Sequence, residues 1–200
     1  PGASSQAHLL KGLSAQSMRD LLRRCEVGNE YRNNACCLFW ILGGNQVGRA
    51  AISGWREILV PALSRYGKDV GIWPFQGDLR TTLLSYPLVI VETYPAEAGV
   101  QVGLPAPGRG WSKRNRDHRI DMGRKLLEWG MDKPIKFDGA RGEIESGFGD
   151  SSVGEDKFDA IVGLLGMLEV ILGYRDDGAP LEDPRLPVEG WILGQRSTPG

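Results

Sequence analysis

Residues 88–94 read Leu-Val-Ile-Val-Glu-Thr-Tyr, and this stretch decides the fold class. Four consecutive apolar residues, most of them β-branched, are typical of a strand that is covered on both faces. Such a strand belongs to a parallel or mixed sheet between helices. Pro95 ends the stretch, because proline has no N–H to donate to a neighbouring strand. We therefore predict an α/β fold with a parallel or mixed sheet flanked by helices.

The rest of the chain is richer in helical than in strand patterns. Apolar residues recur at the helical period over 153–172, which is the most apolar of the predicted helices. The other predicted elements are helices over 14–25, 46–63, 79–85, 112–129 and 137–148, a short strand over 70–75, and a buried apolar segment at 37–42. Two hundred residues are enough for one sizeable core, so we expect a single domain over residues 1–200.

The overall composition narrows the class of protein. A net charge of −1 gives no general attraction to nucleic acid or acidic membranes, so any such affinity must come from a local patch. No apolar run reaches the roughly 18 residues of a membrane span. The first residues also lack a signal-peptide pattern. We expect a cytoplasmic protein without a membrane partner, and the sequence leaves its oligomeric state open.

Cysteine and histidine are scarce in this chain. Cys36 and Cys37 are adjacent, which suits neither an ordinary disulfide nor the usual zinc spacing, so reduced thiols are expected. The chain has only two histidines, His8 and His118, and it has no GxSxG motif. These features argue against a Ser-His-Asp or Cys-His hydrolase.

Glu92 lies near the carboxyl end of the predicted strand at 88–94. In open α/β sheets, ligands bind outside the carboxyl ends of the strands, so an acid at this place is a candidate site residue. The alternative is a structural Glu that pairs with an arginine at the rim of the sheet.

Asp156 and Asp159 open the predicted helix at 153–172, three residues apart and on one face. The pattern Ser152 to Glu155 predicts a capping box, so these two acids are not needed to cap the helix. The same face continues as Gly163 and Gly166, which lets the helix backbone approach its support closely. The alternative is a solvated pair of acids that interacts with the helix dipole.

Together, the three acids offer oxygen ligands for Mg²⁺ or Mn²⁺. Two such ions can activate a water molecule and stabilise the leaving oxygen of a phosphodiester. The predicted catalytic and metal-binding residues are therefore Glu92, Asp156 and Asp159.

Several segments carry a resemblance to a known family. In chain order they are Gly43-Gly44-Asn45-Gln46-Val47-Gly48, Val91-Glu92-Thr93-Tyr94-Pro95, Trp111-Ser112-Lys113-Arg114, Glu155-Asp156-Lys157-Phe158-Asp159-Ala160 and Glu189-Gly190-Trp191-Ile192. This series resembles the family of predicted RNase H-like nucleases, over residues 21–191. The resemblance implies an RNase H-like fold with acids on a first strand, a later strand and the last helix. Glu92 matches the acid of the later strand, and Asp156 with Asp159 matches those of the last helix.

The chain departs from the family pattern at its beginning. The opening strands of the family, with their Asp, have no counterpart, and Asp20 lies in a predicted helix. We expect the chain to be the C-terminal part of a longer protein, lacking its N-terminal strands and inactive as this fragment. Otherwise the protein itself lacks one carboxylate.

A basic run next to Trp111 could hold a phosphate backbone. The predicted nucleic-acid-binding residues, for DNA or RNA, are Lys113, Arg114, Arg116 and Arg119. Because Asp117 and Asp121 are interleaved with this run, the alternative is a solvated charged face.

Three functions stay open at this point. The first is a metal-dependent nuclease of RNase H-like type. The second is a non-catalytic binding module of the same fold, and the third is a metal-dependent phosphohydrolase that acts on small phosphate esters. Metal binding separates the second from the other two, and the preferred substrate separates the two enzymes.

Overall fold

The computed structural model describes residues 5–29, 32–37, 47–150 and 153–196, and these residues form two compact units. Unit 1 lies within Pro1–Val91 and Pro180–Trp191, and unit 2 lies within Glu92–Ala179 and Ile192–Pro199. We predicted one domain over residues 1–200, because no linker in the sequence marks this division. The described chain is mixed α/β, with mostly helices and a small two-stranded parallel sheet.

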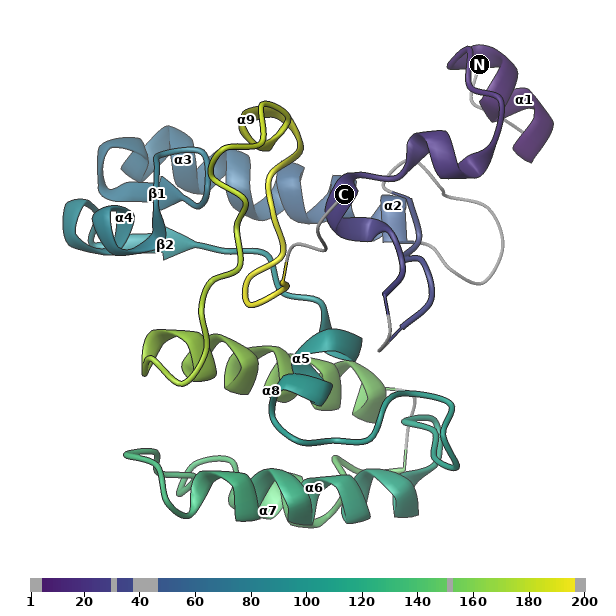
Figure 1. Cartoon of the computed structure of the whole chain (residues 1–200). Coiled ribbons are helices and arrows are strands. Elements are labelled where there is room, and N and C mark those ends of the chain that lie inside the picture. Colours follow the sequence, from purple (N-terminus) through teal and green to yellow (C-terminus); the bar gives the residue numbers. More distant parts are fainter. Residues whose placement is uncertain (1–4, 30–31, 38–46, 151–152, 197–200) are drawn as a thin grey trace. The chain divides into compact units, whose positions relative to one another are not determined.

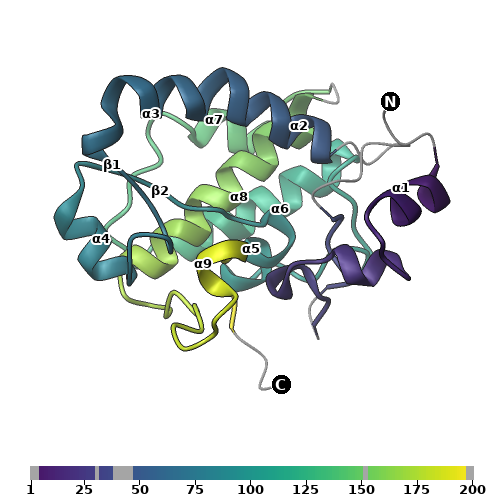
Figure 2. The same ribbon diagram turned by 90° about the horizontal axis from the view of Figure 1, so that it is seen from above.

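The described residues of unit 2 form four helices, which Figure 1 labels. They are α5 (Pro95–Gln101), α6 (Arg116–Gly130), α7 (Arg141–Glu145) and α8 (Val153–Ile171). α5 packs along α8, while α6 packs against α7 and also contacts α8. Figure 2 shows α5 beside α8 from above. The long helix α8 is thus the element that joins the others.

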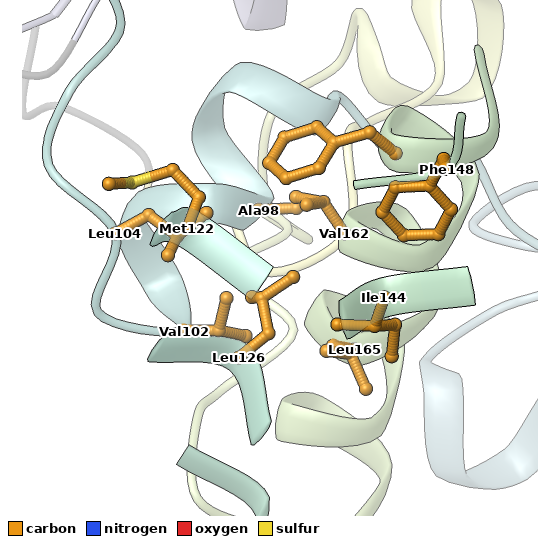
Figure 3. Packing of buried hydrophobic residues seen from close by; sticks show 10 residues of the cluster. Ala98, Val102, Leu104, Met122, Leu126, Ile144, Phe148, Val162 and Leu165 are labelled. Carbon is orange, nitrogen blue, oxygen red and sulfur yellow. The ribbon is translucent and has the colours of Figure 1, made fainter. Parts of the chain in front are cut away.

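The core of unit 2 is apolar and is supplied by these helices and by the segments that follow α5 and α7. Figure 3 shows side chains from α5, α6, α7 and α8 converging on one another. The buried members are Ala98, Val102, Leu104, Met122, Leu126, Ile144, Phe148, Phe158, Val162 and Leu165. Their burial is the main stabilising contribution to this unit.

The glycines of α8 allow the close packing that the sequence predicts. A Cβ added at Gly166 would lie 2.7 Å from the Cβ of Ala98 on α5. A Cβ added at Gly163 would lie 2.9 Å from the Thr93 side-chain oxygen. The prediction that this face of α8 approaches its support closely is confirmed.

Unit 1 holds the sheet and most of the shorter helices. Its elements are α1 (Gln6–Gly12), η1 (Met18–Leu21), η2 (Arg24–Glu26), α2 (Val47–Gly54), the π-helical η3 (Trp55–Leu59), α3 (Val60–Tyr66), η4 (Gly67–Asp69), β1 (Val70–Ile72), α4 (Leu79–Ser85), β2 (Leu88–Ile90) and α9 (Leu186–Glu189). Strands β1 and β2 are parallel, with Gly71 opposite Val89. α4 provides the crossover that a parallel pair requires.

The strand predicted at 88–94 is shorter and less covered than expected. β2 spans Leu88–Ile90, and the Leu88 side chain is 52% exposed. Within the described residues β2 pairs with β1 alone, so the sheet is not the wide, doubly covered one that the apolar run indicated. After β2, Glu92 forms an isolated parallel bridge with Ile192 in unit 2.

Several helix boundaries differ from prediction for local reasons. The helix predicted from residue 112 begins at Arg116, because the side chain of Asn115 caps it by accepting from the N–H of His118. The helix predicted at 14–25 is two 3₁₀ turns, η1 and η2. There the Asp20 carboxylate accepts from the N–H groups of Gln16 and Ser17 and stabilises a turn instead. α4 has the predicted bounds, and residues 38–46 and Ser152 lie outside the described residues.

Within the part of the chain that the structure describes, no helix has both the length and the apolar character needed to cross a bilayer.

Candidate phosphate-binding cleft

A cleft of about 430 Å³ lies in unit 2, between the start of α5, the loop before α6 and the first turns of α8. Its chemistry comes from Tyr94, Trp111, Ser112, Lys113, Arg114 and Asp159. Proline and aliphatic side chains complete the walls. The cleft is therefore largely apolar, with two cations and one carboxylate on its lining.

Asp159 reaches the cleft from the second turn of α8. The helix passes close to the preceding chain at Gly163, one turn further on, where an added Cβ would lie 2.9 Å from the Thr93 side-chain oxygen. Asp159 is half-buried and forms an ion pair with the Lys113 ammonium. Burial raises the pKa of the Asp159 carboxyl above its ordinary value, Lys113 opposes this rise, and the charges of Asp156 and Glu155 add to it.

The loop that carries Lys113 and Arg114 is held by its own hydrogen bonds. The Trp111 indole N–H donates to the carbonyl of Pro105 (3.0 Å). The Ser112 N–H donates to Nδ1 of His118 (3.0 Å), a residue of the first turn of α6, so this helix supports the loop. These bonds fix the backbone from which both cations project.

Arg119 is a structural residue, contrary to its predicted contact with nucleic acid. Its side chain is 1% exposed. The guanidinium donates to the carbonyls of Gly147 (2.8 Å), Lys113 (2.6 Å) and Gly149 (2.6 Å). Gly154 leaves the space that this guanidinium fills, since a Cβ there would lie 2.7 Å from Nη2. Arg119 therefore anchors the Lys113 loop and is not available to a phosphate.

Arg116 does not line the cleft either. Its Nε donates to the carbonyl of Ser146 (2.8 Å), and its Nη1 lies 3.0 Å from the Asp150 carboxylate. Of the four predicted phosphate-binding cations, Lys113 and Arg114 thus lie in the cleft, while Arg116 and Arg119 do not.

The three predicted metal-binding acids occupy different surroundings. Asp159 lines the cleft, whereas Asp156 is exposed on α8 and Glu92 is exposed beside its bridge to Ile192. Within the described ranges, no three His, Cys, Asp or Glu side chains gather in a way that could hold a metal ion. Asp159 therefore lies in the same cleft as Lys113 and Arg114. It does not form a metal-binding triad with Glu92 and Asp156.

Two residues that shape the cleft, Tyr94 and His118, are not among the predicted site residues. Tyr94 is the last residue of the predicted strand at 88–94, and the position of Glu92 near the end of that strand is the signal that could have included it. His118 belongs to the basic run that could hold a phosphate backbone, but its Nδ1 accepts the hydrogen bond from the Ser112 N–H and so supports the loop.

Comparison with known proteins yields no match to this chain among family models, curated proteins or solved structures.

Proposed function

We propose that this protein binds nucleic acid through the cleft of unit 2. The observation that carries the proposal is the placement of Lys113 and Arg114 beside Trp111 on one concave surface. Cations that contact phosphates supply most of the affinity of proteins for nucleic acid, and aromatic rings add stacking with bases.

The cationic side of the cleft favours a phosphate. Among the described residues Arg114 forms no ion pair, while Lys113 has Asp159 as its partner. The lining therefore carries two positive charges and one negative charge, an excess of one positive charge. This local excess supplies the attraction that the net charge of the whole chain does not.

The aromatic side of the cleft favours a base. Trp111 is half-buried, and its indole N–H is held by Pro105. The Trp111 and Phe158 rings meet at 63° with centroids 5.9 Å apart, so Phe158 does not stack flat on the indole. A tryptophan held in this way is a suitable platform for an unpaired base.

Binding of labelled single-stranded DNA and RNA, measured by fluorescence anisotropy over a range of salt concentrations, tests the proposal. Replacing Lys113 and Arg114 by Ala should weaken binding about tenfold or more and flatten its salt dependence, because two phosphate contacts are lost. The matched control replaces Arg124 and Lys125, two exposed cations of α6 outside the cleft. This control removes the same charge and should have a much smaller effect.

Trp111→Leu separates stacking from charge. It should weaken binding by roughly tenfold without changing the salt slope, since base stacking contributes about 1–3 kcal/mol. Trp55→Leu, at an exposed tryptophan of unit 1, is the control. Equal affinities for the wild type and the Lys113/Arg114 variant, with equal salt slopes, would overturn the proposal.

Metal-dependent hydrolysis of phosphodiesters, on an RNase H-like fold, is the second candidate. One observation favours it, because Asp159, a predicted metal ligand, lies on the same cleft as the two predicted phosphate contacts. A metal ion there would have to take Asp159 from Lys113 and recruit Glu92, Asp156 or phosphate oxygens as further ligands. Metal-dependent cleavage that Asp159→Asn abolishes would support this candidate, and cleavage that persists with a chelator would contradict it.

A further inference from the structure

We infer that Asp159 is a built-in counter-ion of the cleft and that a ligand phosphate takes its place on Lys113. The inference rests on the proposed binding of nucleic acid and names the residue that limits its affinity. In the free protein the Lys113 ammonium is held by the Asp159 carboxylate. A bound phosphate offers the same ammonium a second anionic partner at the same surface.

The two charged groups of this ion pair differ in how far they can move. Asp159 sits on α8, whose backbone packs closely against Ala98 of α5 at Gly166. The Lys113 carbonyl is held by Arg119, but its ammonium is carried on a flexible four-carbon stem. Exchange therefore requires rotation of the Lys113 side chain and no movement of either backbone.

The exposure of the pair allows a ligand to reach it. The Lys113 side chain is 43% exposed and that of Asp159 is 26% exposed, and both line the cleft. A partly exposed ion pair contributes little net stability, because water and salt screen it. A phosphate that is also held by Arg114 has an additional partner that Asp159 does not have. The cleft thus selects anions that reach both cations at once.

Removing the competing carboxylate tests the inference. Asp159→Asn should tighten binding of a labelled single-stranded oligonucleotide about fivefold, the upper end for a partly exposed ion pair. Asp156→Asn removes the same charge from an exposed position of α8 outside the cleft and should change affinity less than about twofold. In a Lys113→Ala background, Asp159→Asn should have no further effect, because the shared partner is gone. Circular dichroism confirms that each variant is folded.

Each result has a definite meaning. Equal tightening by Asp159→Asn and Asp156→Asn would show a general effect of charge and would overturn the exchange. An unchanged or weaker affinity of Asp159→Asn would also overturn it, as would tightening that persists without Lys113. The proposed function fails in a separate case, in which Lys113→Ala and Arg114→Ala each bind the oligonucleotide as tightly as the wild type does. If these two variants weaken binding and Asp159→Asn does not tighten it, only the exchange is wrong.

Discussion

Gly166 of α8 lies directly against Ala98 of α5, with its backbone so close that a Cβ would be 2.7 Å from the Ala98 Cβ and 3.3 Å from its Cα. The contact is part of the packing that brings the start of α8, and with it Asp159, to the cleft. Side-chain rotation cannot relieve a clash with a Cβ and a Cα, so one of the two helices would have to shift.

Gly166→Ala should therefore destabilise unit 2 by about 2 kcal/mol, as overpacking of a filled core does. Urea denaturation followed by circular dichroism measures this loss. The control is Gly142→Ala in α7, where an added Cβ meets nothing within 4 Å. Alanine is the better helix former, so the control should be neutral or stabilising by up to about 1 kcal/mol. Equal stability of the two variants would contradict the close approach.

The sequence predicts contacts of this kind better than it predicts the sheet. The glycine face of α8 could be recognised because a helix places residues three apart on one side, whatever the rest of the fold does. The apolar run at 88–94 shows that the chain is hydrophobic but not how many strands lie beside it. The structure makes β2 three residues long and leaves Leu88 half-exposed.

The cleft shows the same limit. The basic run at Lys113 was visible in the sequence, but charge alone does not show which arginines face solvent. Arg119 is buried because carbonyls from the chain after α7 converge on its guanidinium. These carbonyls meet there because of tertiary packing, which cannot be deduced from the spacing of residues along α6.

Arg119→Lys should destabilise unit 2 by roughly 3 kcal/mol, because one ammonium cannot satisfy three diverging carbonyls and buried acceptors are left without donors. Arg124→Lys, whose guanidinium is exposed and pairs with Asp121, should change stability by less than about 0.5 kcal/mol. Thermal unfolding measures both. Loss of the bond to the Lys113 carbonyl should also weaken oligonucleotide binding by Arg119→Lys. Full stability of this variant would mean that Arg119 is not the anchor of the loop.

Acid should destabilise unit 1 through Asp183. Side-chain and backbone donors of Arg185, together with the Arg24 guanidinium, hold the pKa of the Asp183 carboxyl far below its ordinary value. A depressed pKa in the folded state means that the ionised form contributes stability at pH values above the ordinary Asp range. That contribution is lost as the pH falls below about 4, toward the folded-state pKa.

Urea denaturation at pH 7, 4.5 and 3 measures this dependence. The wild-type chain should lose stability between pH 4.5 and 3, and Asp183→Asn should be less stable at pH 7 and lose less on acidification. Asp138→Asn, at an exposed aspartate of unit 2, is the control and should follow the wild-type curve. If the stability of Asp183→Asn and that of the wild type fall by the same amount between pH 4.5 and 3, the Asp183 carboxylate does not cause the loss of stability in acid.

Divalent metal should bind weakly to this chain and more tightly when Lys113 is removed. Of the three predicted metal ligands only Asp159 lines the cleft, so a divalent ion there meets a single carboxylate. Asp159 is in addition paired with Lys113. Lys113→Ala frees this carboxylate and removes a nearby cation, so calorimetry should show Mn²⁺ binding that is about tenfold tighter than in the wild type. Asp159→Asn in the same background should return the affinity to the wild-type level or below.

Arg124→Ala removes an equal charge outside the cleft and should leave Mn²⁺ affinity nearly unchanged. If Lys113→Ala and Arg124→Ala behave alike, Asp159 is not a metal ligand, and nucleic-acid binding without metal-dependent cleavage becomes the better account of the cleft.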